Sequence, residues 1–244
     1  NKGETETYDG TNWTEVADLN SDRRIMGSAG TQTAALCIGG YHDDDGIVGT
    51  VELWNGASWT EVNDLNTDRY AHRGNGISTA ALVTGGRTPG FVDSVEEYDG
   101  TNWTEIADMS QAHNTHGSTG TVTAALASTG HLDPAAIANV ELWNGTSWTE
   151  EADVNTARYQ LGDAGTSTSA LVFGGIPPAS RVTLTEEWDG SSWTEVGDLP
   201  SAKDQFGSAG TATLALAVAG VGPGDLNTTE EWTVSASIET VAFD

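Results

Sequence analysis

The sequence predicts an all-β fold: a five-bladed β-propeller with four short antiparallel strands in each blade of about 45 residues. One observation is that a Trp follows the same short turn at spacings of 46, 44, 45 and 45 residues. The repeated residues are Trp13, Trp59, Trp103, Trp148 and Trp193. The other is that no stretch sustains a helical period of 3.6 residues. A period in this range, carried by short strands, is typical of repeated blades closed into a ring.

Two of the four strands, which we label c and d, form the first predicted hairpin. Residues 4–8 and 13–17 are short runs of strand-forming residues on either side of Asp9-Gly10. An Asp-Gly pair between such runs is a strong signal of a β-hairpin turn. The same pattern returns as Val51–Val62, so we expect a c–d hairpin in every unit.

The other two strands, a and b, form a second hairpin at residues 27–31 and 33–38, which ends in Gly39-Gly40. This hairpin restarts near residues 27, 73, 117, 162 and 207, so residues 1–228 are predicted to be one propeller domain. Closure of a ring removes exposed strand edges.

The sequence holds five a–b hairpins but six c strands. We therefore expect residues 4–17 to close the ring with 207–220, and 229–244 to form a C-terminal strand or tail. The alternative is that 229–243 completes the last blade and 4–17 belongs to a larger ring.

These motifs carry a family resemblance. Strand b ending in Gly-Gly, an aromatic residue in strand c and a Trp after a turn together resemble the kelch repeat, over nearly the whole chain. The sequence Glu-Leu-Trp-Asn-Gly-Thr-Ser-Trp-Thr-Glu also resembles repeat proteins of tailed phages of marine bacteria. The first resemblance implies a kelch propeller with short a–b hairpins. The second implies a virion component, and hence a location in the virion or outside the cell.

Composition excludes some classes of partner. The chain has 9 Lys+Arg against 36 Asp+Glu and a net charge of −27, which argues against binding a nucleic-acid backbone or an anionic membrane surface. No apolar run approaches the roughly 20 residues that span a bilayer, so we expect no membrane insertion. Cys37 is the one cysteine, so no internal disulfide forms.

Charged residues recur at fixed positions of the repeat. A Glu lies two residues before each strand-c aromatic residue, and a basic residue lies five residues after the Asp that closes strand d. The basic residues are Arg23, Arg69, His113, Arg158 and Lys203. We favour an ion pair that ties the d–a loop to a Glu of the repeat. The other interpretation is a ring of cations that binds an anionic or sugar ligand.

The loops between strands b and c differ in length and composition, whereas the a–b and c–d turns are nearly identical. Antiparallel strands place the b–c and d–a loops on one propeller face, and binding usually lies on loops held by a rigid scaffold. This face is therefore the predicted partner face. In addition to the five basic residues above, its candidate contacts are Tyr41, Arg87, Phe91, His131 and Arg181.

Signals for catalysis or metal binding are weak, and we predict no enzyme activity and no cofactor. Kelch-type propellers include copper oxidases, which need Cys, Tyr and His side chains together, but Cys37 lies in an apolar run typical of a core. His72 and His116 share a repeat position and form a weak candidate metal pair. Asp43, Asp44 and Asp45 form a weak candidate calcium cluster, for which a solvated acidic loop is the favoured interpretation.

We therefore hypothesise a non-enzymatic structural, decoration or host-attachment protein of a phage virion. Its expected partners are other virion proteins or a glycan on the host surface, and a homo-oligomer is compatible with the sequence. The alternative is a lectin-type propeller, in which aromatic faces stack on sugars.

Overall fold

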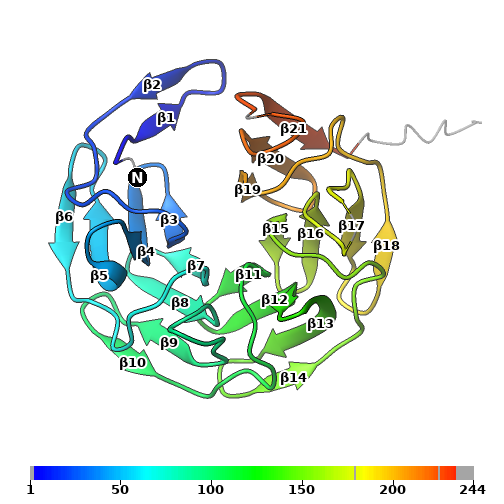
Figure 1. Ribbon diagram of the computed structural model, residues 1–244, viewed down its shortest axis with the longest axis horizontal. Coiled ribbons are helices and arrows are strands. Elements are labelled where there is room, and N and C mark those ends of the chain that lie inside the picture. The colour runs from blue at the N-terminus through cyan, green and yellow to red at the C-terminus, as the bar shows by residue number, and fades with distance from the viewer. Residues whose placement is uncertain (1–2, 179, 225, 235–244) are drawn as a thin grey trace, which may run out of the picture.

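The structure is a computed structural model that describes residues 3–178, 180–224 and 226–234. It confirms an all-β, five-bladed propeller whose strands radiate from a central channel (Figure 1). Blades 1 to 4 are complete four-stranded antiparallel sheets, and the described part of blade 5 has three strands. None of the described elements is a helix of the length and apolarity needed to cross a membrane.

The a–b hairpins form the inner half of each blade. The innermost strands a are β3 (Gly27–Thr31), β7 (Arg73–Ile77), β11 (Gly117–Thr121), β15 (Gly162–Thr166) and β19 (Gly207–Gly210). They start at the five predicted positions. Strands b are β4 (Ala34–His42), β8 (Ala80–Thr84), β12 (Ala124–Leu132), β16 (Ser169–Phe173) and β20 (Leu214–Val218). Gly at the end of strand a is required for the turn: Gly120 has φ 119°, and a Cβ there would lie 2.2 Å from the Ala124 carbonyl oxygen.

The c–d hairpins form the outer half. Strands c are β5 (Gly46–Trp54), β9 (Val95–Tyr98), β13 (Ala135–Trp143), β17 (Thr185–Trp188) and β21 (Thr229–Thr233). Strands d are β6 (Trp59–Val62), β10 (Trp103–Glu105), β14 (Trp148–Glu150) and β18 (Trp193–Glu195). In β4–β5 and β12–β13 the strands continue past Gly39-Gly40 and Thr129-Gly130, so two of the predicted variable loops are extended hairpins that project from blades 1 and 3.

One predicted pairing is wrong. On the edge opposite β19, strand β20 pairs with β21, from Val218↔Thr229 to Leu214↔Thr233, and not with residues 4–17. The reason is local: Glu230 and Trp232 occupy the positions of the other strands c, so β21 follows β20 as β9 follows β8. Thr229–Thr233 therefore belong to the propeller. Residues 235–244 of the predicted tail lie outside the described residues.

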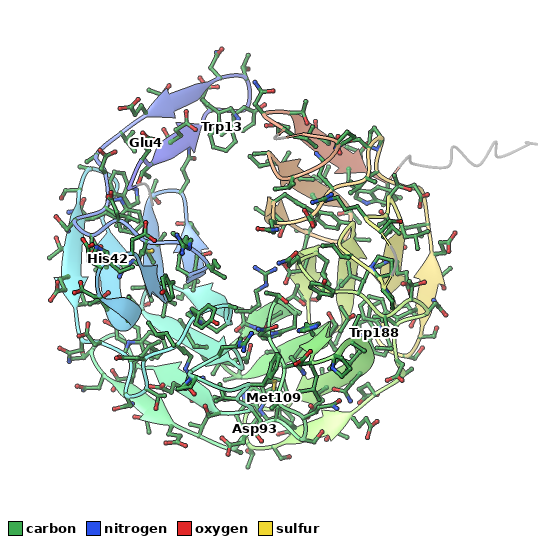
Figure 2. All side chains as sticks on the ribbon, in the orientation of Figure 1. Glu4, Trp13, His42, Asp93, Met109 and Trp188 are labelled. Atoms are coloured by element: carbon green, nitrogen blue, oxygen red, sulfur yellow. The ribbon has the colours of Figure 1, made fainter. Side chains whose placement is uncertain are left out.

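Residues 4–17 instead form a separate hairpin, β1 (Glu6–Tyr8) and β2 (Trp13–Glu15). It lies in the outer part of the ring, between β21 and blade 1 (Figure 1). Its Trp13 side chain points toward the last blade (Figure 2), and the Trp13 indole N–H donates to the Thr229 hydroxyl at 3.3 Å.

The core lies between neighbouring blades and is built from strand b. Leu36 and Ile38 of β4 pack against Ala81 and Val83 of β8, and all four are buried. Large residues on one blade thus meet small ones on the next, which fills the space without voids. The Trp that follows the c–d turn links blades at the periphery: Trp103 Nε1 donates to the carbonyl oxygen of Asn63 at 3.1 Å.

Candidate binding face

The d–a loops before blades 1 to 4 are each fixed by one buried carboxylate. In blade 1, the Glu52 carboxylate accepts hydrogen bonds from the backbone N–H of Asn20 at 2.8 Å and of Ser21 at 3.3 Å. It also accepts one from the Arg23 guanidinium at 2.8 Å, and both charged side chains are almost fully buried. The buried ion pair therefore fixes the position of the d–a loop relative to strand c of blade 1.

The same arrangement recurs around the ring. Arg69 pairs with Glu96 at 2.9 Å, Arg158 with Glu186 at 3.2 Å and Lys203 with Glu230 at 3.1 Å.

Blade 3 is the exception. Glu141 accepts from the backbone N–H groups of Ser110 and Gln111, and neither ring nitrogen of the buried His113 has a partner among the described residues. Burial lowers the pKa of His113 to about 4, so its imidazole is neutral near pH 7.

These five positions are therefore structural. Their side chains are buried within the blades, so they do not offer a ring of cations to a ligand. This agrees with the favoured interpretation of an ion pair and removes Arg23, Arg69, His113, Arg158 and Lys203 from the candidate partner face.

The residue after each of these positions lies on the partner face. It forms a backbone bridge with the residue that follows Gly-Gly in the same blade, as Arg24 does with Tyr41 through two hydrogen bonds of 3.0 and 2.9 Å. The other bridges of this type are Tyr70–Arg87, Asn114–His131, Tyr159–Ile176 and Asp204–Val221. Because the backbone is fixed, the side chains at these ten positions are held at the same level around the channel mouth.

Aromatic and cationic side chains at this level contact one another across blades. The Arg24 guanidinium lies 4.9 Å from the centroid of the Tyr41 ring, which meets the Tyr70 ring edge-on at 5.9 Å. Tyr70 is bridged through the backbone to Arg87.

The series continues over blades 2 to 4. Arg87 lies 4.7 Å over the Phe91 ring, Phe91 is 5.7 Å from His131, and His131 is 4.8 Å from Tyr159. We name these seven residues the aromatic rim: Arg24, Tyr41, Tyr70, Arg87, Phe91, His131 and Tyr159. They are half-buried or exposed, and cation–π and edge-to-face contacts hold the rings in place.

The few cations of the chain are unevenly distributed. Among the described residues, every Lys or Arg is a buried member of an ion pair, lines the central channel, or lies on this face. The last group is Arg24, Arg87 and Arg181, of which Arg181 pairs with the buried Asp204 at 3.0 Å. The opposite face, with its a–b and c–d turns, has no described cation. The partner face thus carries Arg24, Arg87 and Arg181 beside the acidic side chains of its own loops, such as Asp43, Asp44 and Asp45.

The residue that follows Arg24, and its counterpart in each other blade, changes the direction of the backbone toward the innermost strand a at the channel. Ile25, Ala71, Thr115, Gln160 and Gln205 all have left-handed backbone conformations, with φ between 50° and 56°. Neighbouring residues of this series are joined by a hydrogen bond from one blade to the next. The N–H of Ala71 donates to the Ile25 carbonyl at 2.8 Å and that of Thr115 to the Ala71 carbonyl at 2.8 Å, and the series ends at Gln205. Three successive residues therefore have three roles, which are to anchor the loop, to form the rim and to link the blades.

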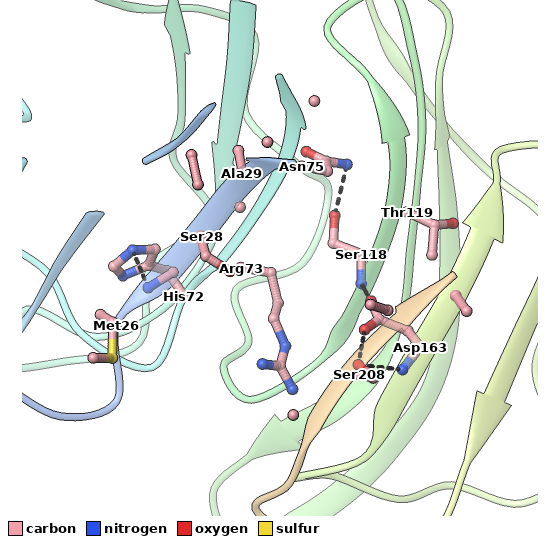
Figure 3. Close-up of a pocket in the computed structure, with 18 of the residues that line it drawn as sticks. Met26, Ser28, Ala29, His72, Arg73, Asn75, Ser118, Thr119, Asp163 and Ser208 are labelled. Carbon is pink, nitrogen blue, oxygen red and sulfur yellow. Dashed lines mark hydrogen bonds between the residues drawn. The ribbon is translucent and has the colours of Figure 1, made fainter. Parts of the chain in front are cut away.

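The central channel has a volume of about 1090 Å³, and both polar and apolar groups line it (Figure 3). Arg73 stands where four other copies have Gly, and its guanidinium donates to the carbonyl oxygens of His116 and Leu161 at 2.5 and 3.0 Å. Asp163 accepts from the Ser118 N–H at 2.5 Å and from the Ser208 hydroxyl at 3.1 Å. Burial raises the pKa of Asp163, and the positive charge of Arg73 opposes this shift. These contacts join blades 2 to 5 across the channel.

The weak catalytic and metal candidates have other contacts. Cys37 is buried, and burial raises the pKa of its thiol. His72 Nε2 accepts the Gly27 N–H at 3.1 Å, and His116 Nε2 lies 2.8 Å from the Thr84 hydroxyl. Asp43 pairs with Arg24 at 2.6 Å, and His42 lies 3.1 Å from Asp45. In residues 3–178, 180–224 and 226–234, no three His, Cys, Asp or Glu side chains are grouped as a metal site would require.

Sequence reasoning named four of the rim residues, Tyr41, Arg87, Phe91 and His131, together with Arg181 as candidate contacts on the face of the b–c loops, and all five lie on that face. It missed Arg24, Tyr70 and Tyr159, whose signal is that each directly follows a basic residue of the repeat. No protein-family model matches the chain, and no curated protein is significantly similar to it.

Proposed function

We propose that this chain is a non-enzymatic binding protein of a phage particle, which uses the aromatic rim and the surrounding b–c loops to decorate the particle or attach it to a host. The observation that carries the proposal is the rim itself. Half-buried rings and cations at one level across four blades form a rigid surface that loses little conformational entropy when a partner binds.

Electrostatics support the same face. Like charges repel across an interface, and most of the surface of this chain is acidic. A partner with an acidic surface is therefore repelled least where Arg24, Arg87 and Arg181 lie. The projecting hairpins β4–β5 and β12–β13 flank this region and add shape that differs from blade to blade.

The particle role rests on the resemblance of the repeat wording to phage proteins. It is tested by separating phage particles on a density gradient and detecting the chain with an antibody. We expect the chain to sediment with intact particles and to leave them only under conditions that dissociate the particle. Recovery of the chain solely as a free protein in the lysate would contradict the proposal.

A lectin is the second candidate, and one observation favours it. Tyr41, Tyr70, Phe91 and Tyr159 are partly exposed on one face, and partly exposed ring faces bind the apolar faces of sugars. A glycan array probed with the chain tests this candidate, with a Tyr159→Ala variant as the matched control. Binding that the variant loses at least tenfold supports the lectin, and an array without any bound glycan contradicts it.

A further inference from the structure

The hairpin β1–β2 has the geometry of a c–d hairpin. Its pairs Glu6↔Glu15 and Tyr8↔Trp13 repeat the pairs Glu52↔Glu61 and Trp54↔Trp59 of blade 1. Its contacts with both neighbours also repeat. Trp59 donates to the hydroxyl of Thr5, the residue before Glu6, and Trp13 donates to that of Thr229, the residue before Glu230. The hairpin is therefore the outer half of a further blade between blades 5 and 1.

The inner half of this further blade, where an a–b hairpin would lie, is bordered by β19–β20 on one side and by β3–β4 on the other. We name the space between these two borders the seam. Elsewhere the blades are joined here by two backbone hydrogen bonds. Gly86 N donates to the His113 carbonyl at 2.9 Å, and Thr115 N donates to the Ala71 carbonyl at 2.8 Å. Both bonds recur at each interface from blade 1 to blade 5.

The corresponding groups at the seam have no backbone partner among the described residues. On the blade 5 side these are the N–H of Gly220 and the carbonyl of Gln205, and on the blade 1 side the carbonyl of Arg23 and the N–H of Ile25. The seam thus presents two donors and two acceptors at the positions where an a–b hairpin of the repeat would pair. Unpaired backbone groups of this kind are a template for strand addition.

Apolar side chains also face the seam. Leu216 and Val218 of β20 are half-buried, whereas Leu171 and Phe173, their counterparts in blade 4, are buried against blade 5. On the other side, Ile25 is 46% exposed, whereas its counterpart Ala71 is 4% exposed. Among the described residues, this is the interface at which the apolar surface of strand b lacks the contacts that the other blades make.

We infer that the seam is a docking site for a two-stranded β-hairpin of a partner polypeptide. The groups at the seam define the hairpin: it carries Gly and Ala where the walls approach closely, and an apolar strand b that covers Leu216 and Val218. A second intact copy of this chain does not fit, because its five hairpins are already packed in its own blades. The site adjoins the aromatic rim, because Arg24 lies between Arg23 and Ile25, but it does not depend on the proposed function.

The first test uses the whole chain and a synthetic peptide with the sequence of residues 113–130, which is one a–b hairpin together with the preceding residues whose backbone groups form the bonds between blades. Isothermal calorimetry is expected to show binding with one peptide per chain. Ile25→Asp, which places a charge on the seam at an exposed position, is expected to weaken binding at least tenfold. Ile77→Asp, at an exposed position of the blade 2 hairpin, is the matched control and leaves binding unchanged.

A second measurement does not require the free peptide to fold. Residues 203–224 are fused directly before Asn1, so that Gly220 of the added segment lies ten residues before Glu6, as it does before Glu230. We expect the melting temperature to rise by several degrees. We also expect the amides of Ile25 and of the Gly220 in blade 5 to become protected from hydrogen exchange. A scrambled fusion is expected to do neither.

The inference is overturned if the peptide does not bind at 1 mM and the register-matched fusion behaves like the scrambled one. It is also overturned if the chain dimerises and Ile25→Asp makes it monomeric, because a second copy would then cover the seam.

Discussion

Arg23 and Arg24 are neighbours in the sequence with opposite roles. Arg23 is buried and paired with Glu52, and its counterparts in the other blades are all basic. Arg24 is 51% exposed and paired with the equally exposed Asp43, and its counterparts are Tyr70, Asn114, Tyr159 and Asp204. The comparison teaches that what the repeats share is scaffold, and that the surface proposed for recognition begins one residue further on, where they differ.

The largest effect is expected when the scaffold member of this comparison is removed. Arg23→Ala leaves the Glu52 carboxylate buried without its cation, which costs about 3–5 kcal/mol of unfolding free energy. Arg24→Ala removes an exposed pair and costs under about 1 kcal/mol. Urea unfolding of both variants measures the difference, and equal losses would contradict the assignment of the two roles.

Blade 3 allows the comparison to be sharpened through pH. The folded-state pKa of His113, about 4, lies below its usual value in an unfolded chain, near 6.5. The unfolded state therefore binds more protons between these values, and stability falls as the pH falls from 6.5 toward 4. This histidine contributes a loss of about 1.4 kcal/mol per pH unit.

His113→Arg gives blade 3 the residue type of blades 1, 2 and 4 and removes this titration. We expect the variant to lose less stability than the native chain between pH 6.5 and 4.5, as measured by urea unfolding at several pH values. Identical slopes for the two proteins would show that His113 is not the source of the acid sensitivity.

The third residue of the series, Ile25, is expected to give a smaller effect of opposite sign. A β-branched residue at φ 56° is strained, and Asn tolerates this conformation better. Ile25→Asn is therefore expected to raise the unfolding free energy by about 1 kcal/mol. Ile77→Asn serves as the control, because Ile77 is similarly exposed but lies in an ordinary strand. A gain of the same size in both would mean that loss of exposed apolar surface, and not relief of strain, is the cause.

The repeat made much of the scaffold predictable. Superposing five copies of one sequence pattern located the strands, the Glu–cation pairs and the Trp contacts, because each depends on residues that every blade shares. The closure of the ring was not predictable in the same way. Whether β20 pairs with residues 4–17 or with β21 depends on which strand is nearer along the chain, and both have the strand-c pattern.

The rim was only partly predictable for a different reason. It arises from contacts between different repeat positions of neighbouring blades, such as Tyr41 with Tyr70 and His131 with Tyr159, and no position on the rim is aromatic in every copy. The cross-channel contacts of Arg73 and Asp163 have the same origin. Each departs from the small residues in the other copies, and that departure was the available signal.

The central claim is that the aromatic rim is the binding surface and the opposite face is scaffold. Its most direct test measures binding of the chain to two probes, a glycan array and phage particles stripped of this protein. The double variant Tyr41→Ala/Tyr159→Ala is compared with Thr101→Ala/Thr146→Ala on the c–d turns. The account predicts that the rim variant loses at least tenfold in affinity for the probe that retains the native chain, while the turn variant binds as the native chain does. Loss of binding in the turn variant with retention in the rim variant would contradict it.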